Sequence, residues 1–411
     1  MKNFSEFDVR CMKRALRLAC KGKGYVEPNP MVGAVVSKNG KIIGEGYHAG
    51  FGKLHAEIEA LKDVVAKGND PDDATMYVTL EPCAHEGKTP PCAPEIVEAG
   101  LSRVIIATED PLWAYHAHRE SGDIEKRRGI EVLSQNGVET ACGLCSGKAL
   151  MLNAPFFKRF AEDLPLVTAK WAMSVDGKIA TRTGESKWIS GPESRRIVHE
   201  IRGQVDAVII GSSTAIQDDP MLNCRDAETR REALRVVLCG NTLPPRECRL
   251  VQTARELPVL IVTTCKRTEE ELAYLRGAGC EVLQVAPSPS GANTVDLRGM
   301  LEHLAGRGAS RVMVEGGREV FGSFFDGELV DEAVIFIAPI VIGGRDAVTA
   351  VGGIGDETVE ESMSLLGPIL TDEELGDLPA KPCVSIQSVG PDILVRGWVK
   401  DPRQWFNGKT G

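Results

Sequence analysis

The chain has 411 residues, and at about 150 residues per domain this length predicts two or three domains, each able to bury its own core. Acidic residues outnumber basic ones by 58 to 48, and the net charge of −10 argues against binding nucleic acid through a basic surface. The longest apolar run, residues 333–342, is too short to span a bilayer, and the charged N-terminus lacks the apolar core of a signal peptide. We therefore expect a cytoplasmic protein with no membrane or nucleic-acid partner, whose twelve cysteines are thiols or metal ligands.

The first part of the chain alternates between patterns typical of helices and of strands. Apolar residues recur at helical spacing from Val9 to Ala19, and apolar runs at 31–37 and 41–47 flank the hairpin dipeptide Asn39-Gly40. Further elements are expected as helices at 55–67 and 94–99, strands at 76–80 and 103–108, and a helix, a turn and a strand within 129–145. This alternation predicts a mostly parallel sheet covered by helices.

A cluster of charges and proline at residues 158–165 indicates a domain boundary. We expect a first domain over 1–148, a linker over 149–165 and a second domain over 166–403. Ser190-Gly191-Pro192-Glu193 predicts a capping box that opens a helix in the second domain. The other expected elements are strands at 166–173, 205–210, 234–238, 258–263, 281–285, 311–314 and 333–342, helices at 269–275 and 297–305, and a hairpin over 384–399. The second domain is therefore predicted to be a second α/β domain with an open sheet.

Three side chains of the first domain have the composition of a catalytic zinc site. His55 opens a predicted helix, Cys83 follows a strand, and Cys92 lies nine residues further along. One imidazole and two thiolates leave the fourth position of a tetrahedral zinc ion open for water, as catalytic sites do. Glu57 is placed to take a proton from that water and deliver it to leaving ammonia. The order of these residues is the zinc-deaminase pattern, whereas chance alone would explain each element but not their combination.

The residues around this site carry a resemblance to a known family. The motifs are Pro28-Asn29-Pro30-Met31-Val32-Gly33, His55-Ala56-Glu57 and Glu81-Pro82-Cys83-Ala84-His85-Glu86-Gly87-Lys88-Thr89-Pro90-Pro91-Cys92. They resemble the bifunctional riboflavin biosynthesis deaminase-reductases. The resemblance implies a cytidine-deaminase-like α/β/α domain in which His55, Cys83 and Cys92 hold zinc, Glu57 is catalytic and Asn29 binds the pyrimidine.

The second domain has no Gly-x-Gly-x-x-Gly motif but offers another device for binding phosphate. The strand at 311–314 runs into Glu315-Gly316-Gly317, and a helix is expected to begin near Arg318. Backbone amides at such a turn, together with the helix N-terminus, attract a pyrophosphate. Glycine pairs also occur in plain turns, so the pattern alone leaves both interpretations open.

The resemblance extends into this domain through residues 170–180, 186–190, 211–214, 218–222 and 314–317. It implies a dihydrofolate-reductase-like α/β fold that binds NADPH. The implied cofactor-binding residues are Ala172, Trp188, Thr214, Asp218, Gly240, Gly317, Arg318, Glu319, Val320, Phe321, Gly322 and Ser323. The implied substrate-binding residues are Ser186, Arg202, Leu222, Arg225 and Glu315, and either arginine is suited to pair with a ribose phosphate through two hydrogen bonds.

Some positions depart from the family pattern. Glu59 stands where a second histidine is usual, and residues 112–128 lack the usual glycine pair near the deaminase substrate. A second group, His116, His118, Cys142 and Cys145, has the residue types of a structural zinc site, although exposed histidines and incidental cysteines are the simpler interpretation.

The resemblance implies a bifunctional enzyme of riboflavin synthesis and a homo-oligomer. The first domain is expected to deaminate 2,5-diamino-6-ribosylamino-4(3H)-pyrimidinone 5′-phosphate by hydrolysis, and the second to reduce its ribosyl group to ribityl with NADPH. One alternative is a single-activity enzyme whose deaminase substrate has changed along with residues 112–128. Another is a deaminase of nucleic-acid bases, which the negative charge and an aromatic content of only 5% oppose.

Overall fold

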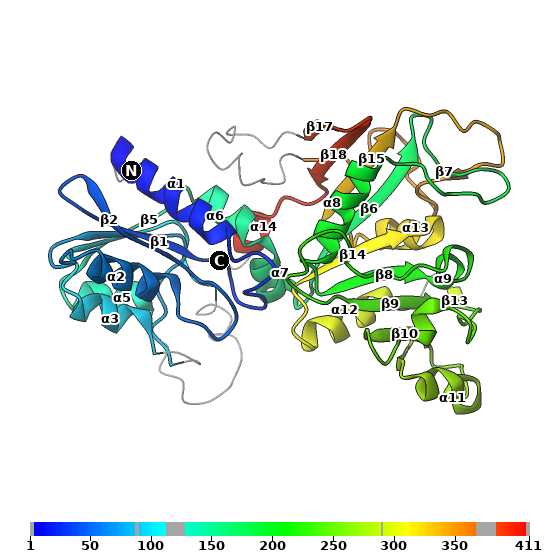
Figure 1. Ribbon diagram of the computed structural model, residues 1–411, viewed down its shortest axis with the longest axis horizontal. Coiled ribbons are helices and arrows are strands. Elements are labelled where there is room, and N and C mark those ends of the chain that lie inside the picture. Colours follow the sequence, from blue (N-terminus) through cyan, green and yellow to red (C-terminus); the bar gives the residue numbers. More distant parts are fainter. Residues whose placement is uncertain (1–3, 87–89, 112–127, 289–290, 367–383, 408–411) are drawn as a thin grey trace. The chain divides into compact units, whose positions relative to one another are not determined.

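The computed structural model describes residues 4–86, 90–111, 128–288, 291–366 and 384–407. These residues form two compact units. The first comprises residues 4–162 together with 402–407, and the second comprises the described residues between 163 and 401 (Figure 1). The C-terminus therefore belongs to the same unit as the N-terminus, and the domain boundaries expected from composition stay a prediction.

The first unit is built on a five-stranded sheet in the order β2-β1-β3-β4-β5. The strands are β1 (Gly33–Lys38), β2 (Lys41–Tyr47), β3 (Thr75–Val78), β4 (Arg103–Ile106) and β5 (Glu139–Cys142). The hairpin between β1 and β2 forms as predicted, with Asn39 and Gly40 both at positive φ. The sheet is mixed rather than mostly parallel, because β1 pairs antiparallel with both β2 and β3, and only β3, β4 and β5 run parallel.

Helices cover both faces of this sheet (Figure 1). They are α1 (Glu6–Cys20), α2 (Ala56–Ala66), α3 (Cys92–Glu98), α5 (Gly129–Gln135), α6 (Ser146–Leu152), α7 (Ala154–Glu162) and α14 (Gln404–Asn407). Apolar side chains of α1 and α6 pack with Val35, Tyr77 and Ile105 in one buried cluster. The first turn of α1 carries the capping box of Ser5 and Asp8, and Asp8 also accepts a hydrogen bond from the Tyr77 hydroxyl at 2.8 Å.

The second unit is built on a nine-stranded sheet in the order β11-β10-β9-β8-β14-β6-β15-β18-β17. The strands are β6 (Leu166–Ser174), β8 (Ala207–Gly211), β9 (Leu234–Cys239), β10 (Val259–Thr264), β11 (Glu281–Val285), β14 (Arg311–Gly316), β15 (Glu332–Ala338), β17 (Ser385–Val389) and β18 (Asp392–Trp398). The first seven strands of that order run parallel, and the hairpin of β17 and β18 adds an antiparallel edge. The parallel strands bring their carboxyl ends to one edge, where open α/β sheets bind ligands.

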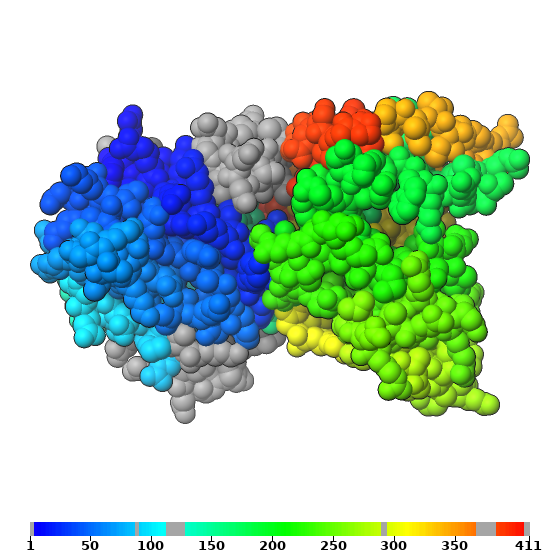
Figure 2. Space-filling view, viewed as in Figure 1, coloured from blue at the N-terminus to red at the C-terminus, as the bar shows by residue number. Residues whose placement is uncertain are grey.

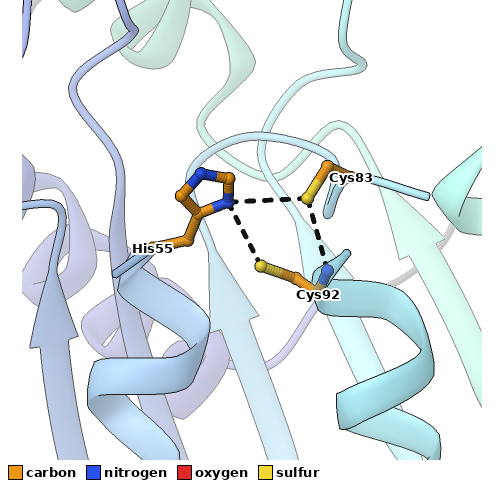
Figure 3. A group of neighbouring side chains, drawn as sticks. All are labelled: His55, Cys83 and Cys92. Carbon is orange, nitrogen blue, oxygen red and sulfur yellow. Dashed lines mark hydrogen bonds between the residues drawn. The ribbon is translucent and has the colours of Figure 1, made fainter. Parts of the chain in front are cut away.

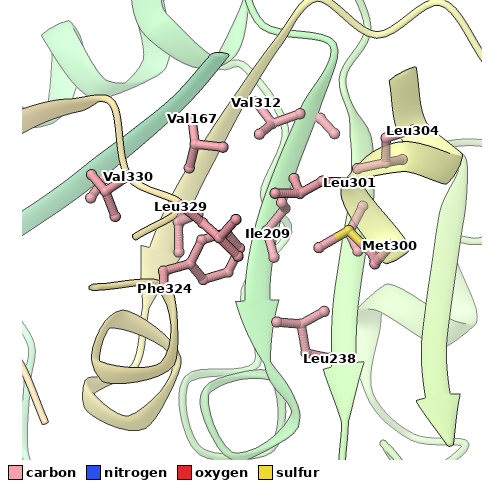
Figure 4. Packing of buried hydrophobic residues seen from close by; sticks show 14 of the residues in the cluster. Val167, Ile209, Leu238, Met300, Leu301, Leu304, Val312, Phe324, Leu329 and Val330 are labelled. Atoms are coloured by element: carbon pink, nitrogen blue, oxygen red, sulfur yellow. The ribbon is translucent and has the colours of Figure 1, made fainter. Parts of the chain in front are cut away.

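Helices also cover both faces of the larger sheet. They are α8 (Pro192–Arg202), α9 (Ser212–Asp218), α10 (Arg249–Gln252), α11 (Glu269–Ala278), α12 (Leu297–Gly306) and α13 (Arg318–Asp326). On one face, Met300, Leu301 and Leu304 of α12 and Phe324 of α13 pack against the strands (Figure 4). On the other face, α10 and α11 bury Leu250, Leu272 and Leu275. The apolar run predicted at 333–342 is an interior strand over its first part, because β15 lies between β6 and β18.

At one end of the second unit, a green and an orange segment lie together in the space-filling view (Figure 2), and they contain a two-stranded ribbon. It pairs β7 (Lys178–Ala180) with β16 (Val348–Thr349). The Asp176 carboxylate accepts hydrogen bonds from the backbone N–H groups of Ile342 and Gly343. A second short ribbon pairs β12 (Pro287–Ser288) with β13 (Gly291–Val295).

The capping box predicted at Ser190 is wrong. The N-cap of α8 is Gly191, and its N–H donates to Asp392 Oδ2 at 2.7 Å, while Ser194 Oγ donates to the same oxygen at 2.5 Å. A buried carboxylate from β18 thus replaces the local cap, which a sequence pattern cannot anticipate. None of the helices in the described ranges is long and apolar enough to cross a membrane.

Gly33 provides a test of the packing between α1 and β1. A Cβ at this position would lie 2.0 Å from the Ala15 carbonyl oxygen and 2.8 Å from the Ala19 nitrogen, both backbone atoms. We expect Gly33→Ala to lower the free energy of unfolding by about 1–3 kcal/mol, because the helix must move off the strand. Chemical denaturation measures this, and Gly147→Ala in α6 is the control because a Cβ there meets nothing within 4 Å. Equal stability of the two variants would contradict the packing.

Candidate metal centre and nucleotide site

The predicted zinc ligands come together from the starts of two helices and from one loop (Figure 3). His55 is the extended N-cap residue of α2, and Cys92 is the first residue of α3 after the N-cap Pro91. Cys83 lies in the loop after β3, and its carbonyl oxygen accepts the Ala93 N–H at 3.0 Å. These local contacts direct one nitrogen and two sulfurs toward a common point.

The distances fit a zinc ion. His55 Nδ1 lies 3.5 Å from Cys83 Sγ and 3.3 Å from Cys92 Sγ, and the three ligand atoms all lie within 4.8 Å of one another. Tetrahedral zinc, with bonds of about 2.0 Å to nitrogen and 2.3 Å to sulfur, separates a nitrogen and a sulfur ligand by about 3.5 Å. Within the described part of the chain, no other group of three or more His, Cys, Asp or Glu has this arrangement. The fourth corner has no protein ligand among these residues, as a catalytic zinc site requires.

The charges of this cluster favour a cation. The hydrogen bond with Cys92 lowers the pKa of Cys83 to about 4, while that same contact and burial raise the pKa of Cys92. Without a metal, the thiolate form is thus favoured at Cys83 and the thiol form at Cys92, and a bound metal ion would favour the thiolate at both. The hydrogen bond with Cys83 raises the pKa of His55.

Glu57 lies beside the ligands without belonging to them. It is in the first turn of α2, is only 3% exposed, and contacts the Cys92 thiol. Burial raises the pKa of its carboxyl group to about 7, which suits a group that must both accept and release a proton. This is the position predicted for the proton shuttle.

A cavity of about 230 Å³ opens in front of the ligands and is lined by Asn29, His55, Glu57 and Cys83. The Asn29 side-chain amide lies 3.3 Å from His48 Nε2, so this residue is held at the cavity wall, where it was predicted to bind a pyrimidine. His48 Nδ1 is 2.9 Å from the Leu54 carbonyl oxygen, and this bond fixes the turn that leads into His55.

In the second unit, the residues predicted to bind NADPH gather where the parallel strands end. Ala172 lies near the end of β6, Thr214 is in the first turn of α9 after β8, and Gly240 follows β9. Gly317 is the N-cap residue of α13 after β14, and a Cβ there would lie 3.1 Å from Thr214 Oγ1. Because Gly317 has no Cβ, no side chain of its own covers the backbone at the start of α13, which suits the binding of a phosphate group.

The remaining residues predicted to bind the cofactor differ in their exposure and in what they contact. Asp218, at the end of α9, accepts a hydrogen bond from Ser186 Oγ at 3.1 Å. Trp188 is 70% exposed, with the Arg195 guanidinium over its ring. Residues Arg318, Glu319 and Val320 form the first turn of α13. The last three positions contact other parts of the protein. Phe321 packs on Trp171, Gly322 lies against the backbone of Gly353, and Ser323 Oγ donates to Glu319 O.

A buried ion cluster lies at the same sheet edge. Glu315 at the end of β14 accepts two hydrogen bonds from the Arg202 guanidinium, at 2.6 and 2.8 Å, and lies 3.0 Å from Lys170 Nζ. Desolvation would raise the pKa of Glu315, but the two cations hold it well below its ordinary value. Arg202 is therefore occupied by Glu315, whereas Arg225 is exposed on the turn after Leu222. Arg225 donates its backbone N–H to His199 Nδ1.

Comparisons with known proteins assign the two units. Residues 5–108 match the family model for the cytidine and deoxycytidylate deaminase zinc-binding region, and residues 165–394 match that for the RibD C-terminal domain. The riboflavin biosynthesis protein RibD of Aquifex aeolicus is 39% identical over 360 residues, covering 88% of this chain and 94% of its own. The chain belongs to the RibD family of riboflavin biosynthesis proteins.

Other relatives agree with this assignment. RibD of Escherichia coli is 33% identical, covering 94% of this chain and 98% of its own. A crystal structure from Thermotoga maritima, described as a diaminohydroxyphosphoribosylaminopyrimidine deaminase/5-amino-6-(5-phosphoribosylamino)uracil reductase, is similar with a TM-score of 0.75. It is 32% identical and covers 95% of this chain and 98% of its own. The predicted family, fold class and pairing of a deaminase with a reductase are confirmed, and zinc and NADPH fit the two domains.

Sequence analysis missed several residues at the RibD deaminase cavity. His48, Lys53 and Phe156 line it, and Phe156 comes from α7, within the segment that composition marked as a linker. The Lys53 ammonium makes no hydrogen bond or ion pair among the described residues. Only His48 had a local signal, because it directly follows a predicted strand.

Glu81 holds the ends of the segment that departs from the family pattern. Its buried carboxylate accepts hydrogen bonds from Asp110 N and Ile130 N and pairs with Arg128 at 3.3 Å. Both flanks of residues 112–127 are therefore anchored beside the cavity, which Asp110 and Glu81 also line. His116 and His118, considered for a second zinc site, lie outside the described residues, so that site stays a prediction.

The Glu315 cluster predicts a measurable loss of stability. Glu315→Gln would leave two buried cations, Arg202 and Lys170, without their carboxylate, and breaking such a pair typically costs about 3–5 kcal/mol. We expect a matching fall in the free energy of unfolding of the second unit at neutral pH, measured by chemical denaturation. Glu200→Gln removes the exposed partner of Arg196 on α8 and should change little. A small effect at both positions would contradict the cluster's role.

Proposed function

We propose that the first unit hydrolytically deaminates 2,5-diamino-6-ribosylamino-4(3H)-pyrimidinone 5′-phosphate and that the second reduces the ribosyl group of the product to ribityl with NADPH. The observation that carries this proposal is the convergence of His55, Cys83 and Cys92 beside a buried Glu57. The Thermotoga maritima neighbour, which is described as the deaminase and reductase of this pathway, supports the choice of substrate.

In the deamination step, a water oxygen bonds to the ring carbon, the carbon–nitrogen bond breaks, and ammonia leaves. Zinc, when bound by His55, Cys83 and Cys92, lowers the pKa of that water and polarises it. The Glu57 carboxylate accepts the water proton and later donates it to the departing nitrogen. Asn29, fixed by His48, offers an amide to the polar edge of the ring.

In the reduction step, the cofactor supplies the hydride and the protein supplies alignment. The bare backbone at Gly317 and the N-terminus of α13 are suited to the cofactor's phosphates. Arg225 is an exposed cation whose backbone N–H donates to His199 of α8, and it is the proposed partner of the substrate phosphate. Arg202, already paired in two hydrogen bonds, more readily holds Glu315 in place.

We also propose a cytoplasmic location, because the described cysteines form no disulfide and the zinc site requires reduced thiols. A homo-oligomer stays a prediction from the family resemblance.

The proposed division of labour is tested by Glu57→Gln. We expect the variant to bind zinc at the wild-type ratio, to lose at least about a hundredfold in deaminase kcat because the proton carrier is gone, and to reduce deaminated substrate normally. Metal analysis and separate assays of the two half-reactions measure this. Cys83→Ser is the matched variant and should lose zinc and deamination together. Deamination that survives in Glu57→Gln would contradict the assignment, and turnover of only one half-reaction by the wild type would support the single-activity alternative.

Lys53 predicts how the deaminase recognises its anionic substrate. It is the one lysine or arginine among the described residues that line the cavity. We expect Lys53→Gln to raise the deaminase KM for the phosphorylated substrate about fivefold, equivalent to about 1 kcal/mol for an exposed ion pair, and to leave the KM for the dephosphorylated nucleoside unchanged. Lys62→Gln, exposed on α2, is the control. An equal change for both substrates would show that Lys53 does not face the phosphate.

A further inference from the structure

The C-terminal residues of the chain form part of the deaminase unit. After β18 completes the large sheet, residues 402–407 belong to the first unit, where α14 packs on α7. Trp405 is 7% exposed although it lies six residues from the end of the chain. The burial of this large side chain indicates that the segment has a specific place to pack.

Trp405 closes a buried polar cluster on α7. Its indole Nε1–H donates to Glu162 Oε1 at 2.7 Å, and the other carboxylate oxygen of Glu162 lies 3.9 Å from Lys158 Nζ. The Lys158 ammonium is also 5.8 Å from the centre of the Trp405 ring, and its side chain is 1% exposed. A buried ammonium is costly without compensating partners, so the carboxylate and the aromatic face together stabilise it.

Aromatic side chains of α7 form a series of ring contacts that connects α14 with the cavity. The Phe406 ring is 5.9 Å from Phe157, Phe157 is 5.8 Å from Phe156, and Phe156 is 4.8 Å from Phe160, all in edge-to-face geometry. Phe156 lines the cavity that contains His55 and Glu57. Aromatic rings packed in this way restrict one another's position.

The residue before α7 is hydrogen-bonded to a second segment near the cavity. Asn153, 1% exposed, accepts the Met31 N–H at 2.8 Å and donates to the Met31 carbonyl oxygen at 2.9 Å. Met31 follows the Asn29-Pro30 segment, which lines the cavity. Helix α7 is therefore fixed at one end to the segment carrying Asn29 and along its length to α14, with Phe156 between them.

We propose that residues 402–407 position Phe156, so that the C-terminus of the chain sets the affinity of the deaminase for its substrate. Trp405 and Phe406 act through α7 and touch neither the substrate nor the metal ligands, and are thus positioning residues. The inference rests on the proposed deaminase function.

The test uses the full-length enzyme, Trp405→Ala, Trp405→Phe, and truncations after Asp401 and after Asn407. We expect Trp405→Ala and truncation after Asp401 to raise the deaminase KM about fivefold to tenfold, with kcat within about twofold, bound zinc unchanged and reductase kinetics unchanged. Trp405→Phe keeps an aromatic ring beside Lys158 but loses the hydrogen bond to Glu162, so it should recover part of the affinity. Truncation after Asn407 leaves α14 intact and should match the wild type.

A double-mutant cycle shows whether Trp405 acts through Phe156. If it does, the KM of Phe156→Ala should not rise further when Trp405→Ala is added. The proposal would be overturned by additive effects on KM in the cycle or by an unchanged KM in Trp405→Ala. It would also be overturned if Trp405→Phe lost bound zinc and kcat while its KM rose. Absence of deamination by the wild-type enzyme would instead overturn the proposed function, so the two failures are distinguishable.

Discussion

One nitrogen and two sulfurs, from residues up to 37 positions apart, must reach the same ion, and this requirement organises the first unit. The starts of α2 and α3 supply His55 and Cys92, and the loop after β3 supplies Cys83. Each ligand thus comes from a backbone position already fixed by a helix start or by a hydrogen-bonded turn. Glu57 follows from the same geometry, because the residue two positions after His55 is buried in the first turn of α2 and contacts the Cys92 thiol.

The second unit must stabilise the charge of a carboxylate, Glu315, at the edge of its sheet. Its parallel strands bring Ala172, Gly211 and Glu315 to one sheet edge. Glu315 is buried there as an anion because Arg202 and Lys170 approach from α8 and β6. In this unit the polar groups lie where strands end, and the buried charge of Glu315 is compensated by protein cations.

Sequence patterns predicted the parts of the protein that local residues determine. The Asn39-Gly40 hairpin, most strands of both sheets and the grouping of His55, Cys83 and Cys92 were found this way, because residue type and order reflect backbone needs and ligand chemistry directly. Contacts between distant residues were not. Asp392 replaces the predicted cap of α8 across 201 positions, and Trp405 holds α7 through Glu162 across 243 positions. Composition predicted a linker over 149–165, and it gave no sign that the side chain of Lys158 is buried.

The family resemblance indicated some site residues that residue patterns alone did not, and it missed others. It directed attention to Asn29 and to the strand ends of the second unit, where the structure has the geometry suited to ligands. It did not identify Lys53 and Phe156, because nothing local distinguishes a cavity-lining lysine or phenylalanine from any other. It also counted Arg202 as a phosphate partner, whereas its two-pronged pairing is with Glu315, 113 positions away.

The central claim is that the metal centre has one imidazole, two thiolates and an open corner. X-ray absorption at the zinc edge of the purified enzyme tests it most directly. The account predicts one zinc per chain with two sulfur neighbours at about 2.3 Å and two lighter neighbours, nitrogen and oxygen, at about 2.0–2.1 Å. In His55→Ala, the nitrogen neighbour should be missing from the zinc coordination or be replaced by a solvent oxygen. A shell of three or four sulfurs, or no bound zinc, would contradict the account.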